Sequence, residues 1–276
     1  MYSAAGWTRK AFGATCRTSM PSRKSSSPAL GIIGGSGLAR LANLAGSRRT
    51  AVRTPYGKPS APLVSGTIGG RRVVFLTRHG DGHVIAPHEI NYRANLWALR
   101  AVKAVDVISI ATVGGIRADL LPGTLVIPDQ IIDYTWGRVP TLGSMGKRGV
   151  THIDFTHPYC ETMRQKLLEA ARAADEKVVD GGTYAATQGP RLETAAEIGR
   201  LERDGADMVG MTGMPEAALA RELGLCYAAI AVVVNQAAGR GASAEGIPVE
   251  KLASVTQRAM KRVHRILDEV ASVDGD

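Results

Sequence analysis

Little in this sequence points to a membrane protein, a disulfide-rich secreted domain or a protein that stacks on nucleic-acid bases. Its 276 residues contain no apolar run of the roughly 20 residues that a transmembrane helix needs. The three cysteines, Cys16, Cys160 and Cys226, show neither a pair motif nor metal-ligand spacing. They predict reduced thiols in a cytoplasmic protein, with Cys226 as a small core residue. Aromatic residues make up only 5% of the chain and show no interleaved stacking pattern, which argues against nucleic acid as a partner.

Acidic residues are absent from the start of the chain: none occurs before Asp81, whereas arginine and lysine recur from Arg9 to Arg78. The net charge is +9, and a basic excess of this kind indicates nucleic acid, an anionic membrane surface or a small anionic substrate. Residues 1–29 supply much of it. They are rich in serine and arginine and lack an apolar period, which predicts a disordered basic tail. An organelle transit peptide or an early start codon would have the same composition.

Residues 30–276 alternate short apolar runs with amphipathic stretches. Such runs are typical of strands buried on both faces of a sheet, and their alternation with helices predicts a single α/β domain. Strands are expected at 30–34, 73–77, 106–113, 124–128, 181–187, 206–211 and 226–234. Helices are expected at 91–103, 159–174, 192–204, 216–223 and 248–270.

A glycine-rich turn, Gly31-Ile-Ile-Gly-Gly-Ser-Gly37, follows the first predicted strand. It departs from the dinucleotide fingerprint in its glycine spacing, and no acidic residue follows about 20 positions later to bind a ribose. It is not a nucleophile elbow, because Leu38 stands where the last glycine belongs, and it lacks the Lys-Ser/Thr of a P-loop. What remains is either an anion-binding turn, with backbone amides and the Ser36 hydroxyl as donors, or a plain strand–turn connection.

A basic motif, Arg78-His79-Gly-Asp-Gly-His83, follows the second predicted strand. Arginine offers an anion a planar fork of donors, and the neighbouring histidine adds another. Since ligands of α/β sheets gather at the carboxyl ends of strands, this motif and Ser36 are expected to share one site. The loop has no helical pair of histidines of the kind that many zinc enzymes use. The alternative is nevertheless a metal site built from His79, Asp81, His83 and His88.

Four further segments place glycines or polar residues at strand ends. Ala111 and Thr112 precede two glycines and offer main-chain amides, although small residues there also suit close packing. Glu193 opens a predicted helix after a Gly-Pro break, where a carboxylate is also a plain capping charge. Thr212 lies where a strand meets a helix. Asn235 ends the most apolar strand, where an amide is more often a turn residue than a ligand.

Taken in order from Gly31 to Gly239, these segments resemble the trimeric family of purine nucleoside phosphorylases and methylthioadenosine phosphorylases. The resemblance implies a twisted mixed β-sheet flanked by helices, a homotrimer, and a nucleoside and inorganic phosphate as substrates. It implies phosphate binding by Ser36, Arg78, His79, Thr212 and the main chain of Ala111 and Thr112. It implies nucleoside binding by Met211 under the ribose, by Leu192, Glu193 and Asn235 around the base, by Ala237 beside them, and by His152 from a neighbouring subunit.

The implied chemistry needs no metal and no organic cofactor. Cleavage of a ribosyl C–N bond builds positive charge on the sugar and negative charge on the departing purine. Phosphate held beneath C1′ by Arg78 and Ser36 serves as co-substrate, nucleophile and counter-charge, and its positioning removes part of the entropic barrier. Asn235 is expected to donate to N7 or O6 of the leaving base. With Glu193 and His79 it forms the catalytic set that the resemblance implies.

Two residues bear on which base is cleaved. A 6-oxopurine offers an N1–H donor and an O6 acceptor, so it matches an ionised Glu193 that accepts and an Asn235 amide that donates. Adenine would aim its N1 lone pair at the carboxylate and leave buried acceptors unpaired. Methylthioadenosine phosphorylases resemble the chain elsewhere but carry aspartate at the position of Asn235 and lack the glutamate. A 6-oxopurine is therefore expected.

The segment after Asn235 bears on the sugar. Inosine-cleaving relatives tend to place a histidine near the 5′-hydroxyl, and residues 236–249 contain none. Ile247 and Val249 would instead form an apolar wall that suits a methylthio group. The Thr-Gly-Met-Pro and Asn-Gln-Ala-Ala-Gly runs also resemble the bacterial S-methyl-5′-thioinosine phosphorylases. The favoured substrate is S-methyl-5′-thioinosine; inosine or guanosine is the first alternative and methylthioadenosine the second.

Three other classes of protein fit the sequence less well. A nucleoside hydrolase uses water and needs a metal or an aspartate cluster, and no Asp-rich motif occurs. A dehydrogenase fails on the glycine spacing and the missing acidic residue. A basic nucleic-acid-binding protein would explain the charge, but the basic residues cluster in the tail. The sequence therefore predicts a cytoplasmic enzyme of purine salvage.

Overall fold

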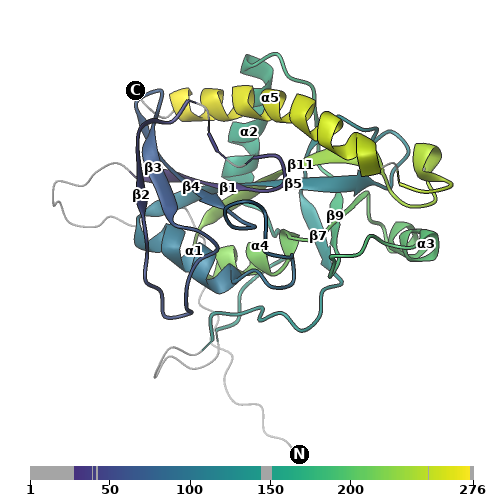
Figure 1. Ribbon diagram of the computed structural model, residues 1–276, viewed down its shortest axis with the longest axis horizontal. Helices are drawn as coiled ribbons and strands as arrows, with labels where there is room; N and C mark the ends of the chain where they lie inside the picture. Colours follow the sequence, from purple (N-terminus) through teal and green to yellow (C-terminus); the bar gives the residue numbers. More distant parts are fainter. Residues whose placement is uncertain (1–27, 39, 42, 144–150, 248, 274–276) are drawn as a thin grey trace, which may run out of the picture.

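The computed structural model describes residues 28–38, 40–41, 43–143, 151–247 and 249–273. Nearly all of the predicted tail, residues 1–27, lies outside the described residues. The described residues form an 11-stranded sheet with helices on both faces (Figure 1). Its strands are β1 (Ala29–Gly34), β2 (Ala45–Thr50), β3 (Leu63–Ile68), β4 (Arg71–Thr77), β5 (Ala104–Gly115), β6 (Leu125–Ile127), β7 (Gln130–Asp133), β8 (Val178–Asp180), β9 (Thr183–Ala186), β10 (Met208–Gly210) and β11 (Cys226–Gln236).

The sheet is mixed, as predicted. Strands β4, β1, β5 and β11 run parallel to one another at its centre. Antiparallel pairs join β2 to β3, β3 to β4, β10 to β5 and β6 to β11. The parallel strands are buried on both faces, which explains their near-continuous apolar sequences. Their carboxyl ends lie side by side and carry the glycine-rich turn, the Arg-His motif and Asn235 to one edge of the sheet.

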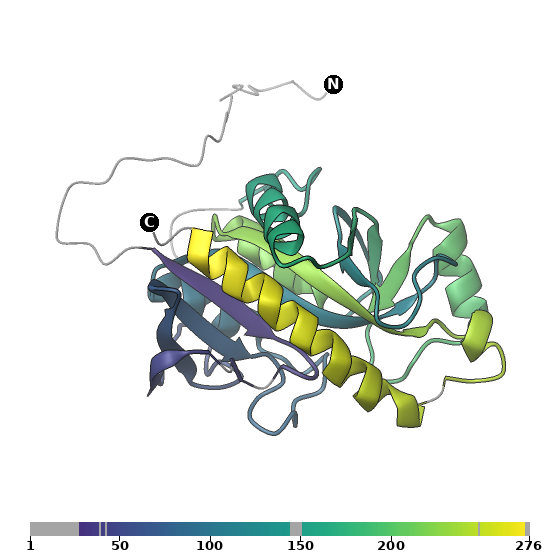
Figure 2. The same ribbon diagram turned by 90° about the horizontal axis from the view of Figure 1, so that it is seen from above.

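Helices cover the two faces of the sheet in pairs (Figures 1 and 2). One pair, α2 (Glu161–Ala173) and α5 (Val249–Val273), packs its apolar side chains on one face, where Ile266 joins the same core cluster as Ile108 and Ile230. The other pair, α1 (Tyr92–Ala101) and α4 (Gly213–Glu222), covers the opposite face. Helix α3 (Ala195–Arg203) lies apart from both pairs, at one end of the molecule (Figure 1).

All seven predicted strands and all five predicted helices occur, with shifts at their ends. Helix α3 begins at Ala195, not at Leu192: Thr194 caps it, and the Thr194 and Glu197 side chains each bond the other's backbone N–H. Four strands, β2, β3, β7 and β8, were not predicted. Strand β2 lies at an edge of the sheet and is exposed at every position, so it carries no apolar run.

The cysteines correct one prediction. Cys160 and Cys226 form a disulfide, with their Cα atoms 5.1 Å apart. Cys160 caps α2 and Cys226 begins β11, and the backbone N–H of Cys160 donates to the Tyr227 carbonyl at 2.7 Å. The expectation of reduced thiols was wrong because the two residues are 66 positions apart in sequence, and only the packing of α2 on β11 brings them together. Cys16 lies outside the described residues.

Within the described part of the chain, no helix is both long enough and apolar enough to cross a bilayer.

Candidate active site

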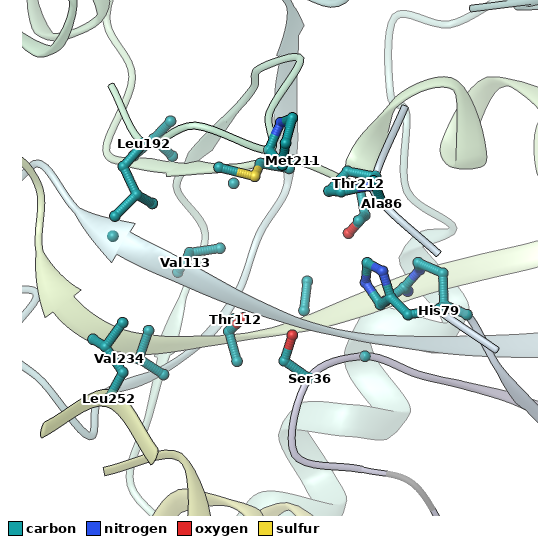
Figure 3. A pocket seen from close by; sticks show the side chains of 18 of the residues that line it. Ser36, His79, Ala86, Thr112, Val113, Leu192, Met211, Thr212, Val234 and Leu252 are labelled. Carbon is teal, nitrogen blue, oxygen red and sulfur yellow. The ribbon is translucent and has the colours of Figure 1, made fainter. Parts of the chain in front are cut away.

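A cavity of about 450 Å³ opens at the carboxyl ends of the central strands. Its size lies within the range of roughly 300–1,000 Å³ that is usual for small-ligand pockets. Figure 3 shows Ser36 and His79 pointing into one space, with Thr212 across from them and Leu192 and Met211 further along. Twelve of the predicted residues line this cavity: Ser36, Arg78, His79, Ala111, Thr112, Leu192, Glu193, Met211, Thr212, Asn235, Ala237 and Ile247.

Arg78 is fully buried at one end of the cavity and is held from several sides. Its Nε donates to one carboxylate oxygen of Glu216 at 2.7 Å, and its Nη2 donates to the other at 3.0 Å. Nη2 also donates to Ser109 Oγ at 2.6 Å, and Nη1 donates to the Ile110 carbonyl at 2.8 Å. Because a guanidinium has five N–H groups, these four bonds leave one Nη1 hydrogen for a ligand.

Glu216 fixes the charge state of Arg78. Burial alone would lower the pKa of Arg78, but the attraction and hydrogen bonds of Glu216 raise it above its ordinary value. Glu216 lies in the first turn of α4, where the helix N-terminus favours a carboxylate. It also accepts hydrogen bonds from Ser109 Oγ at 2.7 Å and from Tyr227 OH at 2.8 Å. Arg78 thus keeps its positive charge, and Glu216 both orients the guanidinium and balances that charge.

The close approach of Arg78 to the glycine-rich turn explains one of its glycines. A Cβ atom on Gly35 would lie 2.4 Å from the Ile110 carbonyl oxygen and 2.9 Å from Arg78 Nη1. Any side chain at this position would therefore displace the arginine or the strand beside it. The turn follows β1, and its Ser36 lines the same cavity as Arg78.

His79 is a neutral imidazole of defined tautomer. Its Nδ1 lies 2.9 Å from the Ile85 carbonyl, which can only accept, so Nδ1 carries the proton and Nε2 is an acceptor. Burial, together with the charge of Arg78, lowers the pKa of His79 to about 4. His79 therefore contributes no positive charge near pH 7.

The alternative metal site is not assembled. The rings of His79 and His83 are 4.3 Å apart, and Asp81 instead forms an ion pair with Arg49. Across the described part of the chain, no three histidine, cysteine, aspartate or glutamate side chains gather in a way that could hold a metal ion.

Asn235 owes its orientation to an irregularity in β11. The register between β11 and β5 shifts between Val233 and Asn235, and such a bulge re-aims the side chains around it. The Asn235 Nδ2 atom donates to the Gln236 carbonyl at 2.7 Å, which fixes the amide and leaves its second hydrogen for a ligand. Asn235 is thus a buried, oriented donor, not a turn residue.

Glu193 also lines the cavity, but it belongs to the segment between β9 and α3, not to the strand that carries Asn235. Its Oε1 accepts a hydrogen bond of 2.6 Å from Thr187 Oγ1. The capping role that a carboxylate there could have had belongs instead to Glu197. Glu193 therefore keeps its second carboxylate oxygen for a ligand.

The apolar side of the cavity differs in part from the prediction. Ile247 lines it, together with Val234 and Leu252, which lie next to each other in Figure 3. Val249 begins α5, but its side chain is outside the described part. His152 is exposed and does not line this cavity. Its predicted role concerns a neighbouring subunit and stays a prediction.

Comparison with known proteins identifies the family. The model of the phosphorylase superfamily matches residues 29–272. The chain belongs to this superfamily. It is therefore an enzyme, of the pentosyltransferase type.

This phosphorylase is similar to proteins with three different names. It is 52% identical over 247 residues to the probable S-methyl-5′-thioinosine phosphorylase of Xanthomonas campestris, covering 90% of this chain and 98% of that protein. It is 46% identical over 217 residues to the probable 6-oxopurine nucleoside phosphorylase of Thermococcus kodakarensis, covering 77% and 80%. A similar solved structure is methylthioadenosine phosphorylase from Schistosoma mansoni in complex with adenine, with a TM-score of 0.83, 36% identity, and coverage of 90% and 92%.

Three functional residues of the phosphorylase escaped the sequence reasoning. Val234 and Leu252 were predicted only as apolar positions of a strand and a helix. Both pack in or against the core as predicted, and both also line the cavity. Glu216 had a clear signal: it is an acidic residue among the small and apolar residues Gly213–Ala220, all of which are buried. A carboxylate in such surroundings needs a buried cationic partner, and Arg78 provides it.

Proposed function

We propose that this enzyme cleaves S-methyl-5′-thioinosine with inorganic phosphate, giving hypoxanthine and 5-methylthioribose 1-phosphate in purine salvage. One observation carries the proposal. A single cavity has at one end a buried arginine whose positive charge is paired with Glu216. Elsewhere in its lining it has a carboxylate acceptor and an amide donor. The first suits an anionic nucleophile and the second pair suits the edge of a 6-oxopurine.

Phosphate would bind between Arg78, Ser36, Thr112 and Thr212, with the amides of the glycine-rich turn as further donors. The remaining Nη1 hydrogen of Arg78 would point to a phosphate oxygen, while the neutral Nε2 of His79 would accept a hydrogen bond from the P–OH group that phosphate carries near neutral pH. One phosphate oxygen then attacks C1′ of the sugar as the C1′–N9 bond breaks. The phosphate also balances the positive charge that builds on the ribose.

The bonding electrons leave with the purine, so the base must be stabilised as it departs. Asn235 would donate its free amide hydrogen to N7 or O6, and Glu193 would accept the N1–H. Both groups are already fixed by hydrogen bonds within the protein, which lowers the reorganisation needed during the reaction. The product base then takes up one proton, completing hypoxanthine.

The sugar preference rests on the apolar wall. Val234, Ile247 and Leu252 offer no hydrogen-bond partner to a 5′-hydroxyl, whereas a methylthio group would bury apolar surface against them. The relative from Xanthomonas campestris supports this choice by its name. Inosine or guanosine is the second candidate, and the 6-oxopurine relative from Thermococcus kodakarensis favours it. The same pair of polar groups disfavours methylthioadenosine.

We also propose that the enzyme is a cytoplasmic homotrimer in which His152 closes the site of a neighbouring subunit, and that it needs no metal or organic cofactor. The family resemblance supports the first part, and the chemistry above, in which protein groups and phosphate suffice, supports the second. Activity that survives dialysis against EDTA would agree with the second part, and loss restored by a metal ion would contradict it.

The test of the proposed reaction is to follow S-methyl-5′-thioinosine with and without phosphate. We expect hypoxanthine and a sugar phosphate, detected by phosphorus NMR, to appear in equal amounts and only when phosphate is present. Release of hypoxanthine without phosphate would mean hydrolysis and would refute the proposal.

A further inference from the structure

Arg138 lies outside the cavity, yet it bonds two chain segments that each contribute residues to the cavity lining. It follows β7, in a stretch where most neighbouring residues are exposed, and its guanidinium lies 5.5 Å from the centre of the Tyr92 ring. Nothing in the sequence marks it, because it is one of many arginines and lies in none of the motifs.

The first segment leads to Glu193. Arg138 Nη2 donates to the Gln188 carbonyl at 2.7 Å and to the Thr187 carbonyl at 3.3 Å, and its Nε donates to Gln188 Oε1 at 3.1 Å. Thr187 in turn donates its hydroxyl to Glu193. Arg138 therefore bonds the backbone of Thr187, and the hydroxyl of Thr187 holds the Glu193 carboxylate, the proposed purine acceptor, in place.

The second segment carries Met211 and Thr212. Arg138 Nη1 donates to the Met211 carbonyl at 2.8 Å and to the Met214 carbonyl at 2.6 Å, and it lies 3.3 Å from the Tyr92 hydroxyl. Met211 and Thr212 both line the cavity, and the predicted positions of ribose and phosphate lie beside them.

The two segments need such a link because their strand pairing has ended. Strands β9 and β10 pair in register only as far as Ala186 and Gly210, and one more bond joins the Thr187 N–H to the Gly210 carbonyl at 2.8 Å. Beyond that point, Arg138 donates hydrogen bonds to backbone carbonyls of both segments. A planar guanidinium can hold several carbonyls at fixed angles, whereas an ammonium group cannot reproduce this fork.

We propose that Arg138 is a positioning residue for the reaction, which sets the distance between the purine-binding carboxylate and the sugar- and phosphate-binding segment. This inference rests on the proposed function. Nucleophile, sugar and base must be aligned when the C1′–N9 bond breaks, and a misplacement of about 1 Å can cost roughly 100-fold in rate. Loss of Arg138 should therefore lower kcat more than it raises KM.

The experiment compares Arg138→Ala with a matched control, Arg262→Ala. Arg262 also bonds two carbonyls, those of Gly123 and Lys177, together with the Glu176 carboxylate, but it does not line the cavity or contact its walls. Kinetics with S-methyl-5′-thioinosine and phosphate are measured per folded enzyme, with the folded fraction taken from circular dichroism. We expect kcat/KM to fall roughly 100-fold in Arg138→Ala and to stay within about threefold of wild type in Arg262→Ala.

Added guanidinium, at a concentration that leaves the wild type unchanged, should restore about tenfold of the lost kcat in Arg138→Ala, and methylammonium should not. If Arg138→Ala does not fold, Arg138→Lys decides: it keeps the charge but not the fork, and a loss of about tenfold is expected. Wild-type kcat/KM in the folded variant, or equal losses in both arginine variants, would overturn the inference. A wild-type enzyme without phosphorolysis would instead refute the proposed function.

Discussion

The two ends of the cavity are built in different ways. At the end that holds Arg78, strand ends and a fully buried network of Glu216, Ser109 and Tyr227 surround one cation. At the other end, half-buried Glu193 and exposed Leu192 lie on a connecting segment, where the Glu193 carboxylate accepts a hydrogen bond from the Thr187 hydroxyl. The first end is part of the core, and the second is attached to it.

We expect the buried end to determine the stability of the fold and the half-exposed end to determine which nucleoside is preferred. A substitution in the buried network leaves an uncompensated charge, so it should damage the fold and the reaction together. A substitution at the half-exposed end should change which nucleoside is preferred while leaving the fold nearly intact. Substitutions at each end of the cavity therefore test whether the two ends differ in this way.

The largest effect is expected from Glu216→Gln. Loss of the carboxylate leaves Arg78 buried without its counter-charge, which should lower the free energy of unfolding by about 3 kcal/mol. It should also misorient Arg78, the proposed hydrogen-bond donor to phosphate, and reduce kcat/KM on the order of 1,000-fold. Urea denaturation and steady-state kinetics measure the two effects. Glu202→Gln, which removes an exposed ion pair with Arg240, is the control and should change stability by less than about 1 kcal/mol.

A loss of activity in Glu216→Gln without any loss of stability would contradict the view that this end of the cavity belongs to the core.

Glu193→Gln should act on the substrate and not on the fold. The neutral amide accepts a hydrogen bond from N1–H more weakly than the carboxylate does. The value of kcat/KM for S-methyl-5′-thioinosine should therefore fall roughly 100-fold. The value for methylthioadenosine should hold or rise, because the carboxylate no longer faces the adenine N1 lone pair. Glu197→Gln, which affects the cap of α3 and the ion pair with Arg191 but not the cavity lining, serves as control. Equal losses for both nucleosides would show that Glu193 does not read the base.

Leu252→Ala should reduce the preference for a methylthio over a hydroxyl group. Removing apolar surface from the 5′ wall should lower the ratio of kcat/KM for S-methyl-5′-thioinosine to that for inosine by about tenfold. Val255→Ala lies on the same helix outside the cavity and should leave the ratio unchanged. An unaltered ratio in Leu252→Ala would place the 5′ group elsewhere.

The last prediction concerns pH, because the protonation of His79 affects stability only as the pH falls below neutral. Because the pKa of His79 is lowered to about 4 in the folded protein, the unfolded chain, with a pKa of about 6.5, binds the proton first as the pH falls. The contribution of His79 to stability is therefore complete above about pH 6.5 and declines toward pH 4. Urea denaturation across this range should show a shallower decline in His79→Asn than in wild type. Parallel curves would contradict the neutral assignment.

Much of the fold could be predicted because the central strands are apolar on both faces. The run 226–234 became β11, and the glycine-rich turn and Arg-His motif were placed correctly at strand ends. Strand β2 could not be predicted, because an exposed edge strand needs no apolar pattern. The pairings that could not be predicted, one in the site and one elsewhere in the fold, span long separations: Arg78 with Glu216 spans 138 positions, and Cys160 with Cys226 spans 66.

We propose that one cavity combines a phosphate-binding end with groups that bind the edge of a 6-oxopurine and an apolar wall around the 5′ group. The decisive measurement compares kcat/KM for S-methyl-5′-thioinosine, inosine, guanosine and methylthioadenosine on one enzyme preparation with saturating phosphate. We predict that S-methyl-5′-thioinosine is the best substrate and that methylthioadenosine falls well below it. Inosine or guanosine as the best substrate would contradict the role of the 5′ wall. Methylthioadenosine as the best would contradict the assignment of Glu193 and Asn235.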